Sequence, residues 1–326
     1  MRFVPSLALA ASVLLPAASR AQGVSPSYAC TELPVTLQTT GGVLRGTLRC
    51  PAGDGPWPVA LLVAGAGPVD RDGNSAMQRE RASTLALLAE GLAARGIATV
   101  RYDKRGVGES AEAALGDSVL RFTTYARDAA EWVQQLQVDQ RFTSVTVVGH
   151  GEGALVGMLA ARTADADGFV SLEGQGRPGV EIMQAEFGPR LPMELRGDFR
   201  RVLATVADGR VEEDVPYPLL SLLRPSAQLY LASWFRYDPP TELGRLSVPV
   251  LIIQGLSDTE STMRDAQLLN AGQPHADAIV LAGVDHSLRL ASSAARGHRA
   301  GAAGRGPVAD QVLEGVASFV AQVRRR

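Results

Sequence analysis

The sequence predicts an α/β fold: a mostly parallel central sheet with helices on both faces and an inserted helical cap. Two observations indicate this class. Short apolar runs alternate with amphipathic runs along most of the chain, as a parallel sheet covered by helices requires. The alternation stops between residues 175 and 246, where helical pieces rich in Arg, Leu, Met and Pro follow one another without a sheet element. We therefore expect this segment to be the cap.

The expected elements of the core follow from the length and period of the apolar runs. Strands are expected where the runs are short, at 59–63, 97–102, 144–148, 169–172, 250–253 and 278–281. Helices are expected at 78–95, which Gly96 ends, and at 308–323. Another helix is predicted by apolar residues that recur at helical spacing: Phe122, Tyr125, Ala129, Trp132, Val133 and Leu136.

Residues 34–48 have the pattern of a β-hairpin. Two strand-like runs, 34–38 and 43–48, are separated by Thr-Thr-Gly-Gly at 39–42, and Cys30 and Cys50 flank the pair. Folding the runs about residue 40 places the two cysteines opposite each other, which predicts a disulfide across the open end of the hairpin. The alternative is two buried free thiols, and an oxidising compartment favours the disulfide.

The N-terminus has the features of a secretory signal peptide. Arg2 precedes an apolar run over 3–18, and Ser19-Arg20-Ala21 offers a small-x-small cleavage site. The run is shorter than the about 20 residues that a membrane anchor needs. We expect removal of residues 1–21 and a periplasmic or secreted protein. The core then comprises 22–174 and 247–326, with the cap at 175–246 between them.

The composition argues against nucleic acid, membrane surfaces and metal ions as partners of this protein. The 326 residues carry 32 Lys+Arg against 34 Asp+Glu, so there is no basic excess that would attract nucleic acid. No basic amphipathic face indicates a membrane-surface role after signal cleavage. The four histidines are scattered and there are only two cysteines, so no metal ligand set and no cofactor are expected. The composition leaves the oligomeric state open.

The most informative peptide joins a buried strand to a helix. Val-Thr-Val-Val at 145–148 runs into Gly-His-Gly-Glu-Gly-Ala at 149–154, with glycines at alternate positions. This peptide resembles the nucleophile elbow, G-x-S-x-G, of the α/β-hydrolase family, in which the turn projects a nucleophile above the sheet. Gly151 stands at the nucleophile position, and Gly149 and Gly153 supply the room that the tight turn needs.

Further segments extend this resemblance over nearly all of the mature chain. Residues 65–73, Gly-Ala-Gly-Pro-Val-Asp-Arg-Asp-Gly, are similar to the oxyanion loop of exported esterase-like and acyl-thioesterase-like hydrolases, and 101–110 match another signature loop. Asp258 follows a buried strand where the family places its triad acid, and His286 follows the last strand where it places the histidine. The resemblance implies an α/β-hydrolase fold and a small-molecule acyl ester or thioester as ligand.

The family's mechanism assigns a separate task to each group. His286 would remove a proton, and Asp258 would hold its tautomer and stabilise the imidazolium. The backbone N–H groups of Ala66 and Glu152 would stabilise a developing oxyanion whatever their side chains are. Asp285 and Glu260 are alternative partners for the histidine.

Other polar residues near these motifs have structural interpretations. Asp70, Arg71 and Asp72 either fix the oxyanion loop through ion pairs or touch substrate, and the structural role is favoured. His150 is expected to support the site rather than to catalyse, and residues 173–178 to form a turn into the cap.

Glycine at position 151 excludes an acyl-enzyme intermediate, because it has no side chain to acylate. It also fits the turn, since the elbow residue adopts a positive φ that glycine tolerates without cost. Three interpretations stay open. The protein is a non-catalytic, ligand-binding relative of esterases; or the Asp258–His286 pair works without a nucleophile; or Gly151 is a one-base variant of serine in an ordinary esterase.

Overall fold

A computed structural model describes residues 31–75, 81–291 and 306–325 of the chain. Its core is an eight-stranded sheet with strand order β1-β2-β4-β3-β5-β6-β7-β8. The pairs β1–β2 and β2–β4 are antiparallel, and all other neighbours are parallel. The prediction of a mostly parallel α/β sheet is therefore confirmed. The strands are β1 (Glu32–Thr39), β2 (Gly42–Arg49), β3 (Trp57–Val63), β4 (Ala98–Tyr102), β5 (Phe142–His150), β6 (Gly168–Leu172), β7 (Val250–Gly255) and β8 (Asp277–Leu281).

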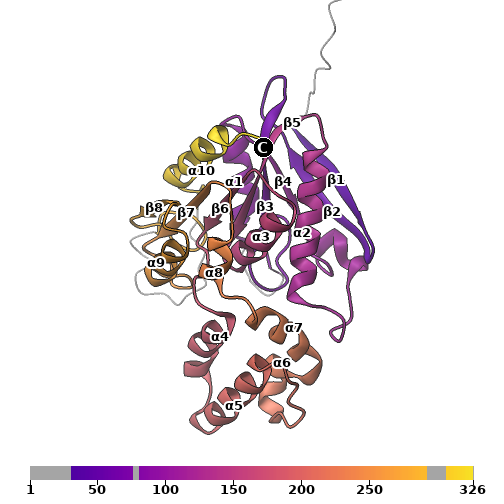
Figure 1. Cartoon of the computed structure of the whole chain (residues 1–326), viewed down its shortest axis with the longest axis vertical. Helices are drawn as coiled ribbons and strands as arrows, with labels where there is room; N and C mark the ends of the chain where they lie inside the picture. The colour runs from indigo at the N-terminus through magenta and orange to yellow at the C-terminus, as the bar shows by residue number, and fades with distance from the viewer. Residues whose placement is uncertain (1–30, 76–80, 292–305, 326) are drawn as a thin grey trace, which may run out of the picture.

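Helices cover both faces of this sheet (Figure 1). On one face, α1 (Thr84–Ala93) and α10 (Asp310–Gln322) bury Leu88 and Val316 in an apolar cluster with the sheet. On the other face, α2 (Phe122–Gln137), α3 (Glu152–Thr163) and α9 (Met263–Gly272) contribute to a larger cluster. The central strands are buried on both sides, which explains why they are continuous apolar runs rather than alternating ones.

The N-terminal hairpin has the expected form. β1 and β2 pair from Glu32–Arg49 to Thr39–Gly42, so the turn falls at residues 40 and 41. Cys50 follows β2 and is buried. Cys30 lies outside the described residues, as does the segment 1–21, so both the disulfide and the signal peptide stay predictions. Within the described ranges, no helix is long and apolar enough to cross a membrane.

Helix α1 begins later than the sequence predicts. The expected helix over 78–95 is wrong at its start, because residues 81–83 are not helical and Ser83 has a φ of 49°. The Asn74 side chain accepts hydrogen bonds from both the N–H and the hydroxyl of Ser83. The Asp72 carbonyl also accepts from Leu85 N–H at 3.0 Å. Contacts with the preceding loop, at residues 72–74, therefore set the start of α1, and hydrophobic periodicity could not locate them.

Only helices lie between β6 and β7 in the described structure. In Figure 1 the segment from α4 to α7 extends away from the sheet, beyond the ends of the strands near α3 and α8. The arrangement is that expected of the inserted cap, while the division of the chain into domains stays a prediction. The helices are α4 (Gly179–Phe187), α5 (Arg196–Ala207), α6 (Leu220–Leu223), α7 (Pro225–Phe235) and α8 (Pro239–Gly244), with short 3-10 turns between them.

Candidate active site

The turn at Gly151 joins the central strand β5 to helix α3. Gly151 has φ 57° and ψ −123°, a left-handed conformation that residues with a side chain adopt only under strain. Its neighbours must be glycine for a different reason. A β-carbon on Gly149 would lie 2.3 Å from the Gly153 carbonyl oxygen, and one on Gly153 would lie 2.4 Å from the Val63 carbonyl oxygen. The sequence therefore forms this sharp turn because backbone packs directly on backbone.

Position 151 faces the imidazole of His286. A β-carbon built on Gly151 would lie 3.3 Å from both Cε1 and Nε2 of that ring. No other heavy atom of the described residues, its chain neighbours aside, comes within 4 Å of this point. A small side chain at position 151 would therefore point at Nε2 of His286, with only the ring beside it.

Asp258 holds the other nitrogen of the ring. Its Oδ2 lies 2.8 Å from His286 Nδ1, and its Oδ1 accepts from the N–H groups of Glu260 at 2.7 Å and Ser261 at 3.2 Å. Burial alone would raise the pKa of Asp258, but the hydrogen bond and charge of His286 hold that pKa below its ordinary value. The structure thus pairs Asp258, rather than Asp285, with Nδ1 of His286.

A second carboxylate lies near the other nitrogen of the same ring. Glu260 Oε2 is 3.4 Å from His286 Nε2, and about a quarter of the histidine side chain is exposed. Burial by itself opposes the charged ring, but the hydrogen bond to Asp258 and the charges of Asp258 and Glu260 raise the pKa of His286 to about 9. The ring is therefore an imidazolium at neutral pH and becomes a free base only in alkaline solution.

His150 supports the backbone of His286. Its Nε2 lies 2.8 Å from the His286 carbonyl oxygen, and the two ring centroids are 4.6 Å apart. Burial, together with the nearby charge of His286, lowers the pKa of His150 to about 3. His150 is therefore neutral and donates its Nε2–H to the carbonyl, a supporting contact that does not use its basicity.

The predicted oxyanion loop lies directly beside the elbow. A β-carbon on Gly65 would lie 3.3 Å from the His150 carbonyl oxygen, so β3 leads the loop past the end of β5. Ala66 follows in this loop, and Glu152 is the first residue of α3. The first N–H groups of a helix have no acceptor within the helix, so the Glu152 N–H is free to bind an oxygen atom. The two backbone donors named from the sequence thus come from adjacent segments.

Lys104 holds the oxyanion loop through a hydrogen bond to its backbone. It is the only lysine of the chain, it is buried, and its Nζ donates to the Gly65 carbonyl. Burial lowers the pKa of Lys104 to about 8, while the nearby Glu152 carboxylate opposes the change. Sequence inspection missed this residue. A single lysine among many arginines, in a loop after a buried strand, is the signal that could have found it.

Ion pairs fix the remainder of the oxyanion loop. The Arg71 guanidinium lies 2.6 Å from Asp103 Oδ2 and 2.6 Å from Glu109 Oε2, and the Arg71 N–H donates to Asp103 Oδ1 at 2.7 Å. Asp72 pairs with the buried Arg101 at 2.8 Å. These contacts join residues 65–73 to the second signature loop, 101–110, and agree with the structural role favoured from the sequence.

Asp70 shapes the loop internally. Its Oδ1 accepts from the N–H groups of Asp72 and Asn74, each at 2.9 Å. This side chain therefore closes a tight turn within the loop, an Asx-type arrangement of the kind that short acidic side chains favour.

Glu173 is a second residue that sequence inspection missed. Residues 173–178 connect β6 to α4, as a turn into the cap would, and Glu173 is fully buried at the start of this connection. Side chains at the carboxyl ends of parallel strands converge at one edge of the sheet, and this position is the signal that could have singled it out.

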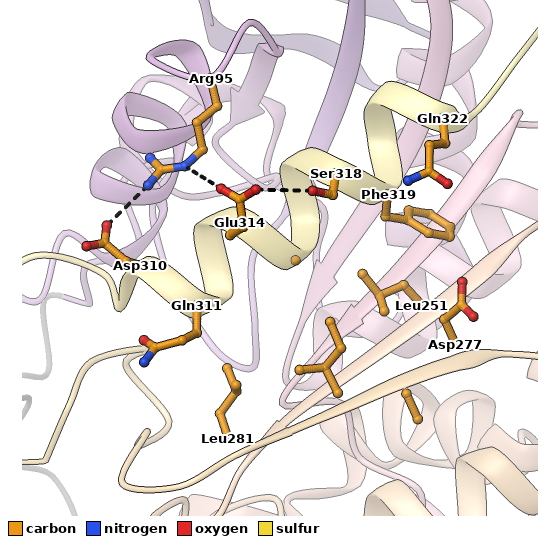
Figure 2. Close-up of a pocket in the computed structure, with 13 residues that line it drawn as sticks. Arg95, Leu251, Asp277, Leu281, Asp310, Gln311, Glu314, Ser318, Phe319 and Gln322 are labelled. Carbon is orange, nitrogen blue, oxygen red and sulfur yellow. Dashed lines mark hydrogen bonds and ion pairs between the residues drawn. The ribbon is translucent and has the colours of Figure 1, made fainter.

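A separate groove of about 980 Å³ lies between the edge strand β8 and helix α10 (Figure 2). Leu251, Ile279 and Phe319 supply apolar surface, and Asp310 and Glu314 at its rim pair with Arg95. None of the candidate catalytic residues lines it, so it is distinct from the site at Gly151 and His286.

Comparisons with known proteins agree with the fold. Esterase EstD from Thermotoga maritima is 27% identical over 246 residues, which are 74% of this chain but only 57% of that protein. Among solved structures, Est1E from Butyrivibrio proteoclasticus superposes with a TM-score of 0.57 at 15% identity, covering 88% of this chain and 96% of that one. A thermophilic esterase from Thermogutta terrifontis gives 0.54 at 17% identity, covering 90% and 99%. Likenesses at such identities establish the fold alone. Residues 50–298 match the profile of the Alpha/beta hydrolase family, and the chain therefore belongs to that family.

Proposed function

We propose that this protein binds carboxylic esters or acyl thioesters at the Gly151–His286 site and hydrolyses them slowly, through water rather than through an acyl-enzyme. The observation that carries the proposal is the gap at residue 151. A β-carbon there would lie 3.3 Å from His286 Nε2, and the histidine retains its carboxylate partner. The similarity to an esterase over 74% of the chain supports the same class of ligand.

The reaction would begin with a bound ester whose carbonyl oxygen accepts hydrogen bonds from the backbone N–H groups of Ala66 and Glu152. In the neutral form of the ring, His286 Nε2 takes a proton from a water molecule as that water attacks the carbonyl carbon. Asp258 stabilises the imidazolium that results, and the amides stabilise the oxyanion. The protonated ring then gives its proton to the leaving alcohol or thiol, and the carboxylic acid is released.

The electrostatics of the site make this reaction slow at neutral pH. Asp258 and Glu260 raise the pKa of His286 to about 9, so most molecules hold the ring as imidazolium and have no base for the water. Removing the nucleophile from a serine hydrolase costs about 10⁶ in turnover and leaves roughly 10³ to 10⁴ over the reaction in water. A rate of that order is the expectation for this protein.

The test is hydrolysis of a short-chain nitrophenyl ester by the unmodified protein and by three variants: His286→Ala, Gly151→Ser and the double variant. We expect weak turnover that His286→Ala abolishes, and a large gain for Gly151→Ser that the double variant loses. A rate unaffected by His286→Ala would contradict catalysis by the histidine. Ester binding without turnover would instead identify a ligand-binding protein, the second candidate, which the missing nucleophile favours.

We further propose that the protein is exported after cleavage between Ala21 and Gln22 and that Cys30 and Cys50 form a disulfide. The supporting features are the N-terminal pattern of the sequence and the hairpin whose second strand ends at Arg49, next to Cys50. Intact mass of the protein recovered from the periplasm or medium, before and after reduction and alkylation, measures both features together. An uncleaved N-terminus or two alkylatable thiols without prior reduction would refute the respective part.

A further inference from the structure

The carboxyl group of Glu173 lies against Gly255, near Asp258, and the proposed reaction does not use it. Glu173 follows β6, has no exposed surface and has a φ of 48°, a left-handed conformation that is strained for a glutamate. A buried acid keeps such a backbone conformation only when contacts with neighbouring residues stabilise it, and these contacts indicate what the Glu173 side chain does.

The contacts of Glu173 form a built site on the adjacent strand β7. Both of its oxygens accept from the Gly255 N–H, at 2.9 and 3.0 Å, and Oε2 accepts from Gln254 Nε2 at 2.6 Å. A β-carbon on Gly255 would lie 2.9 Å from Glu173 Oε1 and 2.3 Å from the Val284 carbonyl oxygen. Glycine at position 255 therefore lets the carboxyl group approach the backbone just before the loop that carries Asp258.

The carboxyl group of Glu173 also lies close enough to that of Asp258 for a hydrogen bond. A hydrogen bond between two carboxyl groups needs a proton on one of them, and two buried carboxylates in contact would repel each other strongly. The partners of each group decide where that proton resides. Asp258 accepts from the charged ring of His286 and from two backbone N–H groups, whereas the donors to Glu173 are neutral amides.

We propose that Glu173 is a positioning residue that stays protonated at neutral pH and donates a hydrogen bond to Asp258, so that Asp258 is held against His286. The carboxyl groups then form a chain in which Glu173 holds Asp258 and Asp258 holds the imidazolium. The effect of Glu173 on turnover rests on the proposed function, whereas its protonation and its hydrogen bond to Asp258 do not.

The electrostatic environment agrees with this assignment. Burial, followed by the negative charge of Asp258, raises the pKa of Glu173 to about 9, whereas that of Asp258 is lowered. The titratable groups around the pair are His286, which contacts Asp258 through Nδ1, Glu260, which lies near the other ring nitrogen, and the neutral His150, whose ring lies beside that of His286. Glu260 is more than half exposed and therefore serves as a charged comparison for the buried acid.

An NMR titration of the His286 ring separates a neutral Glu173 from a charged one. Glu173→Gln keeps the shape, can accept from Gly255 and can donate to Asp258, so it imitates the protonated acid. Because Glu173 loses its proton only in the alkaline range in which His286 titrates, we expect the variant to lower the His286 midpoint by less than about half a pH unit. The matched control, Glu260→Gln, removes a carboxylate 3.4 Å from Nε2 and should lower that midpoint by about one unit. A fall of about one unit or more in Glu173→Gln would overturn the proposal, because it would mean that a negative charge had been removed.

Turnover in the Gly151→Ser background tests the positioning role. Glu173→Leu removes the donor to Asp258, and we expect kcat to fall more than tenfold with KM changed less than threefold, while Glu173→Gln keeps kcat within about threefold. Equal rates in the two variants would overturn the positioning role. If Gly151→Ser is inactive, the proposed function fails, but the titration still tests the protonation of Glu173 and its bond to Asp258. The titration likewise decides the matter if Glu173→Leu does not fold.

Discussion

A β-carbon placed on residue 151 would lie 3.3 Å from Nε2 of His286, although residue 151 is glycine and has no such atom. The turn, the histidine and its carboxylate partner therefore keep the arrangement that a nucleophilic side chain would use. Only that side chain is missing. The short distance to His286 Nε2 therefore allows specific predictions for variants that add a side chain at position 151.

Replacement of Gly151 is expected to separate stability from activity. Gly151→Ser and Gly151→Ala should each lower the free energy of unfolding by about 1 to 2 kcal/mol, because both place a side chain at positive φ. Only the serine variant should gain esterase turnover, by at least about 10³-fold. Urea unfolding and nitrophenyl ester hydrolysis measure the two effects. An equal gain in Gly151→Ala would show that the hydroxyl group is not responsible.

The charge of His286 should make stability depend on pH. Its pKa is raised from 6.5 to about 9 by folding, so its charged form stabilises the native state fully below pH 6.5 and progressively less up to pH 9. The difference in unfolding free energy between the unmodified protein and His286→Ala should be roughly 3 kcal/mol smaller at about pH 10 than at about pH 6. Urea unfolding at both pH values measures it. A difference that grows with pH would contradict the raised pKa.

Asp103 is expected to be a main anchor of the oxyanion loop. Asp103→Ala removes the buried partner of Arg71 and the acceptor for the Glu109 N–H, so stability should fall by roughly 3 kcal/mol. The matched control is Glu186→Ala, which breaks the exposed pair with Arg190 and should change stability by less than about 0.5 kcal/mol. Thermal or urea unfolding of both variants checks the contrast, which equal losses would refute.

Lys104 is expected to position the oxyanion loop through the Gly65 carbonyl. In the Gly151→Ser background, Lys104→Met should lower kcat by roughly tenfold or more, because a small displacement of the loop misplaces the Ala66 N–H. Lys104→Arg should not restore the rate, since a planar guanidinium does not replace a compact ammonium group in a buried site. Steady-state kinetics, with unfolding curves to confirm folding, measure both variants. Full activity of Lys104→Met would exclude this role.

The sequence predicted much of the molecule because much of its pattern is local. The hairpin turn near residue 40, the strands of the core and the elbow at Gly151 each depend on neighbours a few positions away. Hydrophobic period and glycine spacing report such contacts directly. The order of Asp258 and His286 after their strands was equally visible, and the structure brings these two residues within hydrogen-bond distance of each other.

Tertiary structure alone decided which distant groups meet. The start of α1 at Thr84 depends on Asn74 and Asp72, and the contact of Glu173 with Gly255 joins residues 82 positions apart. Such contacts depend on strand order, which places β6 beside β7 although the cap separates them in the chain. The sequence by itself therefore determined most of the elements, the family resemblance and the glycine at position 151. The packing of parallel strands decided that Glu173 is buried against Gly255 and that Lys104 reaches the Gly65 carbonyl. Burial and proximity set the charge of such groups, and a linear pattern contains neither.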